Sequence, residues 1–447
     1  MLEALYSGGI EAVLFVTPPT GEMLQRYDHV RAFGIAGNSR TMSLAEMDAA
    51  LPSVFQTLLA YNPKIIHYKV CSTFDSSPEA GSIGRAIDIG QSVCNNRIIP
   101  LSVASPPLGR YCAFGNLFAR SGLNSEPYRL DRHPTMRHHP ITPMAEADLR
   151  AHLALQTSRP IELVDVLALE GGYDAARSTL LDMQMPGTVA LFDSLTDEHL
   201  TTVGRLICDI QEREQKPLFV VGSSGVDYAL VNCWRLDDSE THAAHLGRRV
   251  PSTSVSSVDR TIILSGSCSP VTNRQIGWAL ENGFADVAVD PLNLQDSEQQ
   301  EREISSLGSR IAALFDRGQS VVVHTSRGPT DPRIAALKSA SESNGKCLEL
   351  GDILGRILHT VLRVCQVGRV AIVGGDTAGQ VARSLGVEAV EMIGPLEPGA
   401  PLCVVHSSDN TVDGLEVTFK GGQVGYDDFF GTLLSGKREQ PLIGAIT

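Results

Sequence analysis

A strand, a glycine turn and a helix follow one another between Val370 and Gly379. Val370–Val373 is a continuous apolar run, which is typical of a strand buried on both faces of a parallel sheet. Gly374-Gly375 follows, and behind it apolar residues recur at helical spacing. Strand, polar loop and helix alternate in the same way along much of the chain, so the sequence predicts an α/β fold.

The two glycines make this turn a candidate anion site. Without a Cβ, the N–H groups at Gly374 and Gly375 can approach a ligand closely. The start of the following helix adds a partial positive charge, and the combination suits a phosphate group. An ordinary tight turn between a strand and a helix has the same pattern, so the turn alone does not decide between them.

Charge and cysteine usage limit the partners and the compartment. The 447 residues predict two or three domains, and 37 basic against 51 acidic residues disfavour nucleic acid or an anionic membrane as the main partner. No apolar run approaches the ~20 residues of a membrane span. The nine cysteines are scattered without a C-x-x-C pair, which favours a reducing cytoplasm over a disulfide framework or a zinc ribbon.

Two Rossmann-like domains with mostly parallel sheets and a ligand cleft between them are the predicted architecture. The polar stretch 237–259 separates them, which gives an N-terminal domain over residues 1–240 and a C-terminal domain over 255–447. Residues 105–145 hold six prolines and predict a long irregular excursion. Its histidines favour ordinary loop residues over a metal site, because no third ligand follows at a fixed spacing.

Three polar turns follow predicted strands in the C-terminal half, at 265–269, 325–327 and 374–377. In an open α/β sheet, ligands bind at the carboxyl ends of strands, so these turns predict a nucleotide pocket. The chain has no Walker A motif and no G-x-G-x-x-G fingerprint. An enzyme that uses NAD is therefore the weaker alternative.

Two cations, Arg40 and Lys69, lie at strand ends in the N-terminal half, beside hydroxyl and amide groups. The planar fork of an arginine matches a carboxylate in a bidentate pair. A small polyhydroxylated carboxylate is therefore the predicted ligand of this half. For either residue taken alone, an ordinary surface cation is the competing interpretation.

Several motifs, in order along the chain, resemble the four-carbon acid sugar kinase family. They are the segments 37–40, 68–78, 139–144, 265–272, 374–379, 420–422 and 427–430. Members of this family phosphorylate tetronates, 3-oxo-tetronates and related acid sugars with ATP, so the resemblance implies an acid sugar in the N-terminal domain and ATP in the C-terminal one. The segment Cys71–Ser76 resembles the branch that acts on 3-oxo acids, and the 3-oxo-isoapionate kinases are close competitors.

The resemblance also implies a role for individual residues. Those that would hold the acid sugar are Arg40, Lys69, Val70, Cys71 and Ser72. Those that would contact the nucleotide are Ser267, Ser269, Gly374, Gly375, Asp376, Thr377 and Gly421. Mg²⁺ would bridge the phosphates of ATP, and the sequence identifies no protein ligands for it.

One departure from the family concerns the start of the chain. Family members open with a strand that ends in Asp-Asp-Phe-Thr-Gly, and this sequence begins at the helix that follows it. Asp75 is then the candidate general base within the sequence. The rival interpretation is a catalytically impaired protein that binds nucleotide and sugar acid, and we expect slow turnover from the chain as written. The sequence leaves a homodimer open.

Overall fold

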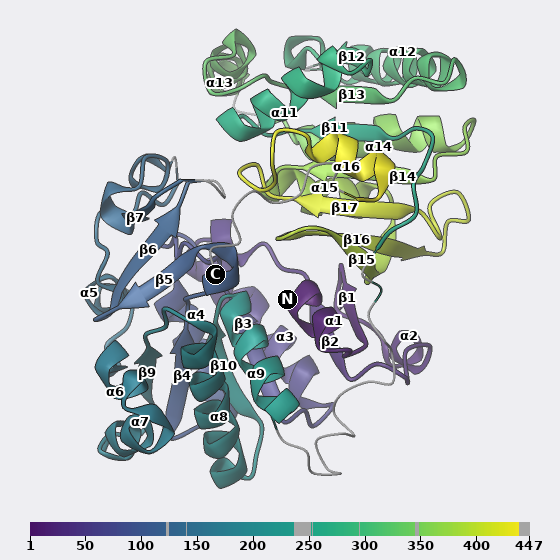
Figure 1. The fold of residues 1–447 in the computed structure, drawn as a ribbon. Helices are drawn as coiled ribbons and strands as arrows, with labels where there is room; N and C mark the ends of the chain where they lie inside the picture. Colours follow the sequence, from purple (N-terminus) through teal and green to yellow (C-terminus); the bar gives the residue numbers. More distant parts are fainter. Residues whose placement is uncertain are drawn as a thin grey trace. The chain divides into compact units, whose positions relative to one another are not determined.

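The computed structural model describes residues 1–121, 125–139, 141–236, 252, 254–294, 296–344 and 348–437 (Figure 1). The chain divides into two compact units. The first comprises Met1, Glu3–Glu11 and Asn38–Arg249, and the second comprises Leu2, Ala12–Gly37 and Val250–Thr447. Of the predicted boundary stretch, residues 237–251 and 253 lie outside the described residues.

The first unit is built on a five-stranded sheet in the order β3-β10-β4-β9-β8, and every pair in it is parallel. Its strands are β3 (Ile65–Lys69), β4 (Ile98–Ser102), β8 (Ile161–Val164), β9 (Thr188–Phe192) and β10 (Leu218–Gly222). The α-helices within residues 1–236, apart from α2 of the second unit, are α1 (Leu2–Ser7), α3 (Leu44–Leu59), α4 (Ile83–Cys94), α5 (Leu149–Ala154), α6 (Val166–Glu170), α7 (Gly172–Leu181), α8 (Asp197–Glu214) and α9 (Ser224–Leu236).

Helix α3 shows how local sequence sets an element of this unit. Ser43 precedes it and Glu46 lies three residues on, which is the spacing of a capping box. The Ser43 N–H donates to the Glu46 carboxylate at 2.7 Å, and the Ser43 hydroxyl accepts from the Glu46 N–H at 3.4 Å. Met47, Leu51 and Phe55 then recur at helical spacing and are buried in the core under the sheet.

Part of the proline-rich excursion is regular, contrary to the prediction for residues 105–145. It contains a three-stranded antiparallel sheet made of β5 (Arg110–Ala113), β6 (Asn116–Arg120) and β7 (Pro127–Arg129). Phe114 and Gly115, at φ of 52° and 79°, form a two-residue hairpin loop between paired residues. Both positive φ values suit a hairpin, but Phe is not the Asn or Asp that announces such a turn in a sequence.

The second unit is built on a nine-stranded sheet in the order β12-β13-β11-β14-β17-β16-β15-β1-β2, which is mostly parallel (Figure 1). Its strands are β1 (Ala12–Phe15), β2 (Ala32–Ile35), β11 (Ile262–Ser265), β12 (Ala285–Ala288), β13 (Val321–His324), β14 (Arg369–Val373), β15 (Val387–Glu397), β16 (Ala400–Ser407) and β17 (Glu416–Lys420). Its α-helices are α2 (Gly21–Gln25), α11 (Pro270–Glu281), α12 (Ser297–Asp316), α13 (Pro332–Asn344), α14 (Leu350–Leu362), α15 (Gly375–Ser384) and α16 (Phe429–Ser435). The predicted pair of α/β units with mostly parallel sheets is confirmed.

Strands β1 and β2 depart from the predicted domain limits. The sequence predicts both as strands, but they extend the sheet of the second unit, where Val13 of β1 pairs with Glu391 of β15. Residues 12–37 therefore do not belong to the N-terminal body predicted over 1–240. A short apolar pattern indicates a strand, whereas the partner of that strand is set by contacts with residues far away in the sequence.

Candidate functional site

The three predicted turns of the C-terminal half lie at one edge of the nine-stranded sheet. Strands β13, β11, β14 and β17 are consecutive neighbours and run parallel, so their carboxyl ends meet there. Ligands of open α/β sheets bind at such an edge. The edge is thus the place to look for a nucleotide.

The glycine turn between β14 and α15 presents uncapped backbone donors. Gly374 has φ of 122°, a conformation open mainly to glycine, and its N–H donates to the Lys420 carbonyl at 2.9 Å. No side chain caps α15, and the N–H groups of Gly375, Asp376 and Thr377 have no acceptor among the described residues. A Cβ on exposed Gly375 would project into open space, so this face of the turn is accessible to a ligand.

The serine turn after β11 packs directly against the glycine turn. A Cβ on Gly266 would collide with the Thr377 hydroxyl, and one on Gly422 would collide with the Ser267 hydroxyl. Residues from three strand ends are therefore in contact, among them the predicted Ser267 and Thr377. Ser267 and Ser269 also have structural partners: Ser269 caps α11 through the Val271 N–H at 3.2 Å, and Ser267 accepts the Ser269 N–H at 3.2 Å.

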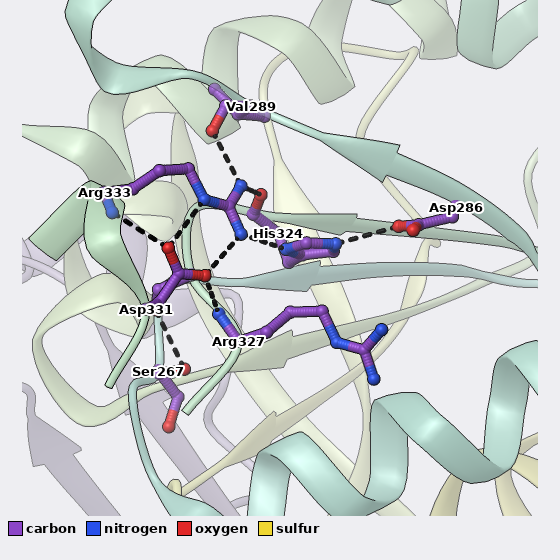
Figure 2. A network of polar contacts seen from close by, with 8 residues as sticks. Ser267, Asp286, Val289, His324, Arg327, Asp331 and Arg333 are labelled. Carbon is purple, nitrogen blue, oxygen red and sulfur yellow. Dashed lines mark hydrogen bonds and ion pairs between the residues drawn. The ribbon is translucent and has the colours of Figure 1, made fainter. Parts of the chain in front are cut away.

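The third turn, after β13, is fixed by a buried polar network (Figure 2). The Ser326 hydroxyl donates to the Ser267 carbonyl at 3.4 Å, which joins this turn to the serine turn. The Arg327 N–H donates to Asp331 at 2.6 Å, while Figure 2 shows the Arg327 guanidinium directed away from that carboxylate. The backbone of the turn is thus held from two sides.

Arg333 is the centre of that network, and all five of its N–H donors have acceptors. They bond both oxygens of Asp331, the carbonyls of Val289 and His324, and His324 Nδ1, at distances between 2.7 and 3.3 Å. His324 Nε2 in turn lies 2.8 Å from Asp286, which fixes the proton on Nε2 and leaves Nδ1 as an acceptor. Burial, with Arg333 and Arg327 nearby, lowers the pKa of His324 despite Asp286, so this neutral form is favoured.

We expect Asp331→Asn to lower the free energy of unfolding of the second unit by about 3 kcal/mol, because a nearly buried ion pair would lose one partner. Hydrogen bonds from Arg333 hold the pKa of Asp331 below its ordinary value. The stabilisation is therefore present above about pH 4 and is lost as the pH falls further. Urea unfolding of wild type and variant at pH 7 measures the difference.

The control is Asp427→Asn, which removes an exposed ion pair with Arg274. Its expected effect stays below about 1 kcal/mol. Equal losses in the two variants would contradict a special role for the Arg333 network.

In the first unit, the structure pairs two residues that the sequence identified separately. Arg40 Nη2 lies 2.5 Å from Asp75, whose side chain is fully buried, while 42% of the Arg40 side chain is exposed. The Thr73 hydroxyl donates to the other Asp75 oxygen at 2.5 Å, and His139 Nε2 lies 3.2 Å from Arg40. A guanidinium held in this way can present its exposed part to a carboxylate.

The backbone next to Asp75 is strained. Phe74 is fully buried and adopts φ of 53°, which a bulky residue rarely does. Such strain persists only where the surroundings fix it, and it concentrates at functional sites. Gly81, at φ of 60°, contacts the Arg40 carbonyl so closely that no side chain would fit. The segments that carry Arg40 and Asp75 are thus held in one arrangement.

The other predicted sugar-site residues differ from one another in burial and in their contacts. Lys69 is exposed at the end of β3. Burial raises the pKa of Asp227, but His67 and, more weakly, the terminal amine and Lys69 hold it below the ordinary value. Lys69 is therefore one of the positive charges near Asp227. Val70 is buried, with its N–H bonded to the Gly222 carbonyl at 2.8 Å, and Cys71 Sγ lies 3.0 Å from the Thr73 hydroxyl. Ser72 is half-buried.

Three residues of this cluster were not singled out as site residues from the sequence. Thr73 contacts Asp75, His139 contacts Arg40, and the Tyr68 hydroxyl lies 2.9 Å from that of Ser39 beside Arg40. Thr73 and Tyr68 belong to the same polar strand end as Lys69, and this position could have identified them as site residues. His139 begins the family-like segment 139–144, but its contact with Arg40 joins residues 99 apart and could not be read from that segment.

The sequence matches two family profiles, a sugar-binding N-terminal domain over residues 1–230 and a nucleotide-binding C-terminal domain over residues 262–430. It is 42% identical to a 3-oxo-isoapionate kinase of Paraburkholderia graminis, over 98% of this chain and 91% of that protein. It is 27% identical to a 3-oxo-tetronate kinase of Pseudomonas savastanoi pv. phaseolicola (96% and 92% covered) and 29% identical to one of Pseudomonas fluorescens (96% and 92%).

Solved structures support the same fold. A Salmonella typhimurium LT2 protein superposes with a TM-score of 0.73 at 23% identity, over 96% of this chain and 94% of that one. A Haemophilus influenzae protein gives 0.66 at 21% identity, over 97% and 95%. With near-complete coverage in both domains, the chain belongs to the four-carbon acid sugar kinase family.

Proposed function

We propose that this protein is an ATP-dependent kinase that phosphorylates a hydroxyl group of a small acid sugar of the 3-oxo-isoapionate type. The observation that supports it most is the 42% identity to a 3-oxo-isoapionate kinase over nearly the whole chain. Identity to the 3-oxo-tetronate kinases is lower, at 27–29% for the two Pseudomonas proteins, and a 3-oxo-tetronate is the second candidate substrate. These relatives do not favour a binding protein without kinase activity.

The uncapped turn at Gly374–Thr377 fits the phosphates of ATP. Three N–H groups without acceptors among the described residues, an open face at Gly375 and the start of α15 are the features of a phosphate site. Ser267, Ser269 and Gly421 would line the same pocket. Phosphoryl transfer depends mainly on positioning and on neutralising charge, which such donors supply.

The proposal includes Mg²⁺, because kinases bind this ion together with ATP. Among the described residues, no three carboxylate, histidine or cysteine side chains form a metal cluster. Mg²⁺ in kinases takes several ligands from phosphates and water and few from protein, so such a cluster is not required. When bound, the ion would neutralise phosphate charge during transfer.

Arg40 and its neighbours would bind the acid sugar. Arg40 would pair with the substrate carboxylate, with Lys69, Val70, Cys71 and Ser72 completing the binding segment. Asp75, buried behind Arg40, is the carboxylate proposed to accept the proton of the reacting hydroxyl.

We expect Arg40→Lys to weaken binding of the acid sugar by about 1.5–3 kcal/mol, which is about 10- to 150-fold, and to leave ATP affinity unchanged. A lysine provides a point charge where the pair with a carboxylate needs a planar fork. Calorimetric titration with each ligand measures both affinities.

Arg85→Lys is the matched control. Arg85 also pairs with an aspartate, Asp48, at 2.6 Å, and its side chain is 41% exposed. Both affinities should remain at the wild-type value in this variant. A parallel loss of ATP affinity in Arg40→Lys would indicate a folding defect and not a lost substrate contact.

The function itself is tested by ADP release from a panel of four- and five-carbon acid sugars. The highest kcat/KM is expected for 3-oxo-isoapionate. Higher kcat/KM for a 3-oxo-tetronate would transfer the assignment to the second candidate. No ADP release with any acid sugar would refute the kinase proposal.

The cellular setting is also a proposal. Among the described residues, no helix combines the length and apolar character needed to cross a bilayer. Scattered cysteines without a C-x-x-C pair support a cytoplasmic location. The homodimer stays a prediction, which light scattering on the purified protein would test.

A further inference from the structure

Lys420 is a buried lysine at the edge where the nucleotide is proposed to bind. It ends β17 and is 1% exposed, and its carbonyl accepts the Gly374 N–H of the glycine turn at 2.9 Å. Lysine is rarely buried so completely without a specific partner. The role of this side chain therefore needs an explanation.

Its ammonium group is used to hold one peptide bond. Lys420 Nζ donates to the Gly421 carbonyl at 3.0 Å and lies 5.6 Å from the centre of the buried Phe429 ring. All described peptide bonds are trans, so the Gly422 N–H points opposite to the Gly421 carbonyl and therefore away from Nζ. The Val424 N–H also donates to this carbonyl, at 3.1 Å, so Lys420 and Val424 together fix the direction of the Gly422 N–H.

The Gly422 N–H belongs to a residue that contacts Ser267 of the proposed phosphate pocket. It has no acceptor among the described residues. A Cβ on Gly422 would collide with the Ser267 hydroxyl, and the Gly422 carbonyl accepts from the Thr272 hydroxyl at 2.8 Å. One side of this peptide is thus bonded within the protein, while its N–H is a donor available to a ligand.

We propose that Lys420 is a positioning residue of the nucleotide site, which orients the Gly421–Gly422 peptide toward a phosphate group and takes up a proton from solvent when that group binds. This inference rests on the proposed function. It assigns Lys420 a role through Gly422 and makes no claim that Nζ itself touches the nucleotide.

The proton uptake follows from the surroundings of Nζ. Burial lowers the pKa of Lys420 to about 7, and Glu397 at the end of β15 opposes this. Glu397 is itself 5% exposed and accepts the Tyr426 N–H at 2.9 Å, and Phe429 of α16 contributes no charge. An anionic phosphate bound beside this lysine favours the ammonium form. Nucleotide affinity should therefore be highest below pH 7 and fall as the pH rises above it.

The test is calorimetric titration of the full chain with a non-hydrolysable ATP analogue at pH 8. The analogue is one whose last phosphate pKa is about 6, like that of a phosphate ester, so that its phosphates are already fully ionised at this pH. Titrations in two buffers with different heats of ionisation give the number of protons taken up. We expect about half a proton or more per nucleotide for wild type, since most Lys420 side chains start neutral.

Lys420→Met keeps the length of the side chain and removes its donor and charge. Proton uptake should disappear, and both the Kd of the analogue and the KM for ATP should rise about tenfold, with kcat little changed. Lys216→Met is the matched control, because Lys216 Nζ also donates to a backbone carbonyl, that of Asn95, in the first unit. This control should bind and take up protons like wild type.

The outcomes separate this inference from the proposed function. Binding of the analogue by wild type without proton uptake would overturn the role of Lys420, and so would wild-type affinity in Lys420→Met. Failure of wild type to bind the analogue at all would contradict the kinase proposal instead. Should Lys420→Met fail to fold, the uptake measured on wild type still decides.

Discussion

Gly375→Val is expected to reduce ATP affinity by about a hundredfold or more while leaving the protein folded. The added side chain would occupy the open face of the turn, where a phosphate would otherwise approach the N–H groups that begin α15. Two lost hydrogen bonds to a charged group are worth about 3 kcal/mol or more together, and each 1.4 kcal/mol is a factor of ten in affinity. Calorimetry with a non-hydrolysable analogue gives the affinity, and thermal unfolding reports on the fold.

Gly368→Val is the matched control at the other end of the same strand. Gly368 is also exposed, and a Cβ there would likewise meet open space. This control should bind ATP with wild-type affinity. Unchanged affinity in Gly375→Val would place the phosphates elsewhere. Gly374→Ala is unsuitable for the comparison, since φ of 122° makes any side chain at that position strained.

Asp75→Asn is expected to lower kcat by about 10²- to 10⁴-fold, the usual contribution of a general base. Asparagine has nearly the same shape and can still accept the Thr73 hydrogen bond, but it cannot accept a proton from the acid sugar. Steady-state kinetics at saturating ATP, with the acid sugar varied, gives kcat and KM separately.

A different result would assign Asp75 another role. If Asp75 only holds Arg40, the KM for the acid sugar would rise and kcat would stay near the wild-type value. Asp88→Asn provides the control, because it removes an aspartate that pairs with Arg159 at 2.6 Å in the same unit. Its kinetic constants should match those of wild type.

Elements with local signals were predictable from the sequence. The capping box at Ser43 and Glu46 placed the start of α3 correctly, because both hydrogen bonds join residues three apart. The hairpin at Phe114 and Gly115 was missed, since its conformation depends on the strands that it joins. The sheet that receives β1 could not be predicted either, because its partner, β15, is distant in the sequence.

The same distinction holds for the candidate site: residues with a local sequence signal were predictable, and contacts between distant residues were not. The glycine turn at Gly374 was evident because a strand, glycines and a helix follow one another directly. The pairing of Arg40 with Asp75 joins residues 35 positions apart, and the left-handed conformation of Phe74 has no signature in that residue type. The function of Lys420 depends on a peptide direction that only the folded chain defines.

The placement of β1 in the sheet of the second unit has a consequence for biosynthesis. Its partner residues around Glu391 are translated about 380 residues after Val13. At about 5–20 residues per second, the ribosome needs roughly 20 to 75 seconds to supply them. Throughout that interval the emerging chain carries a short apolar strand that can pair with β2 but lacks its second neighbour, and such an edge invites aggregation. The nascent polypeptide should therefore depend on chaperones at an early stage, long before the nucleotide unit can close its sheet.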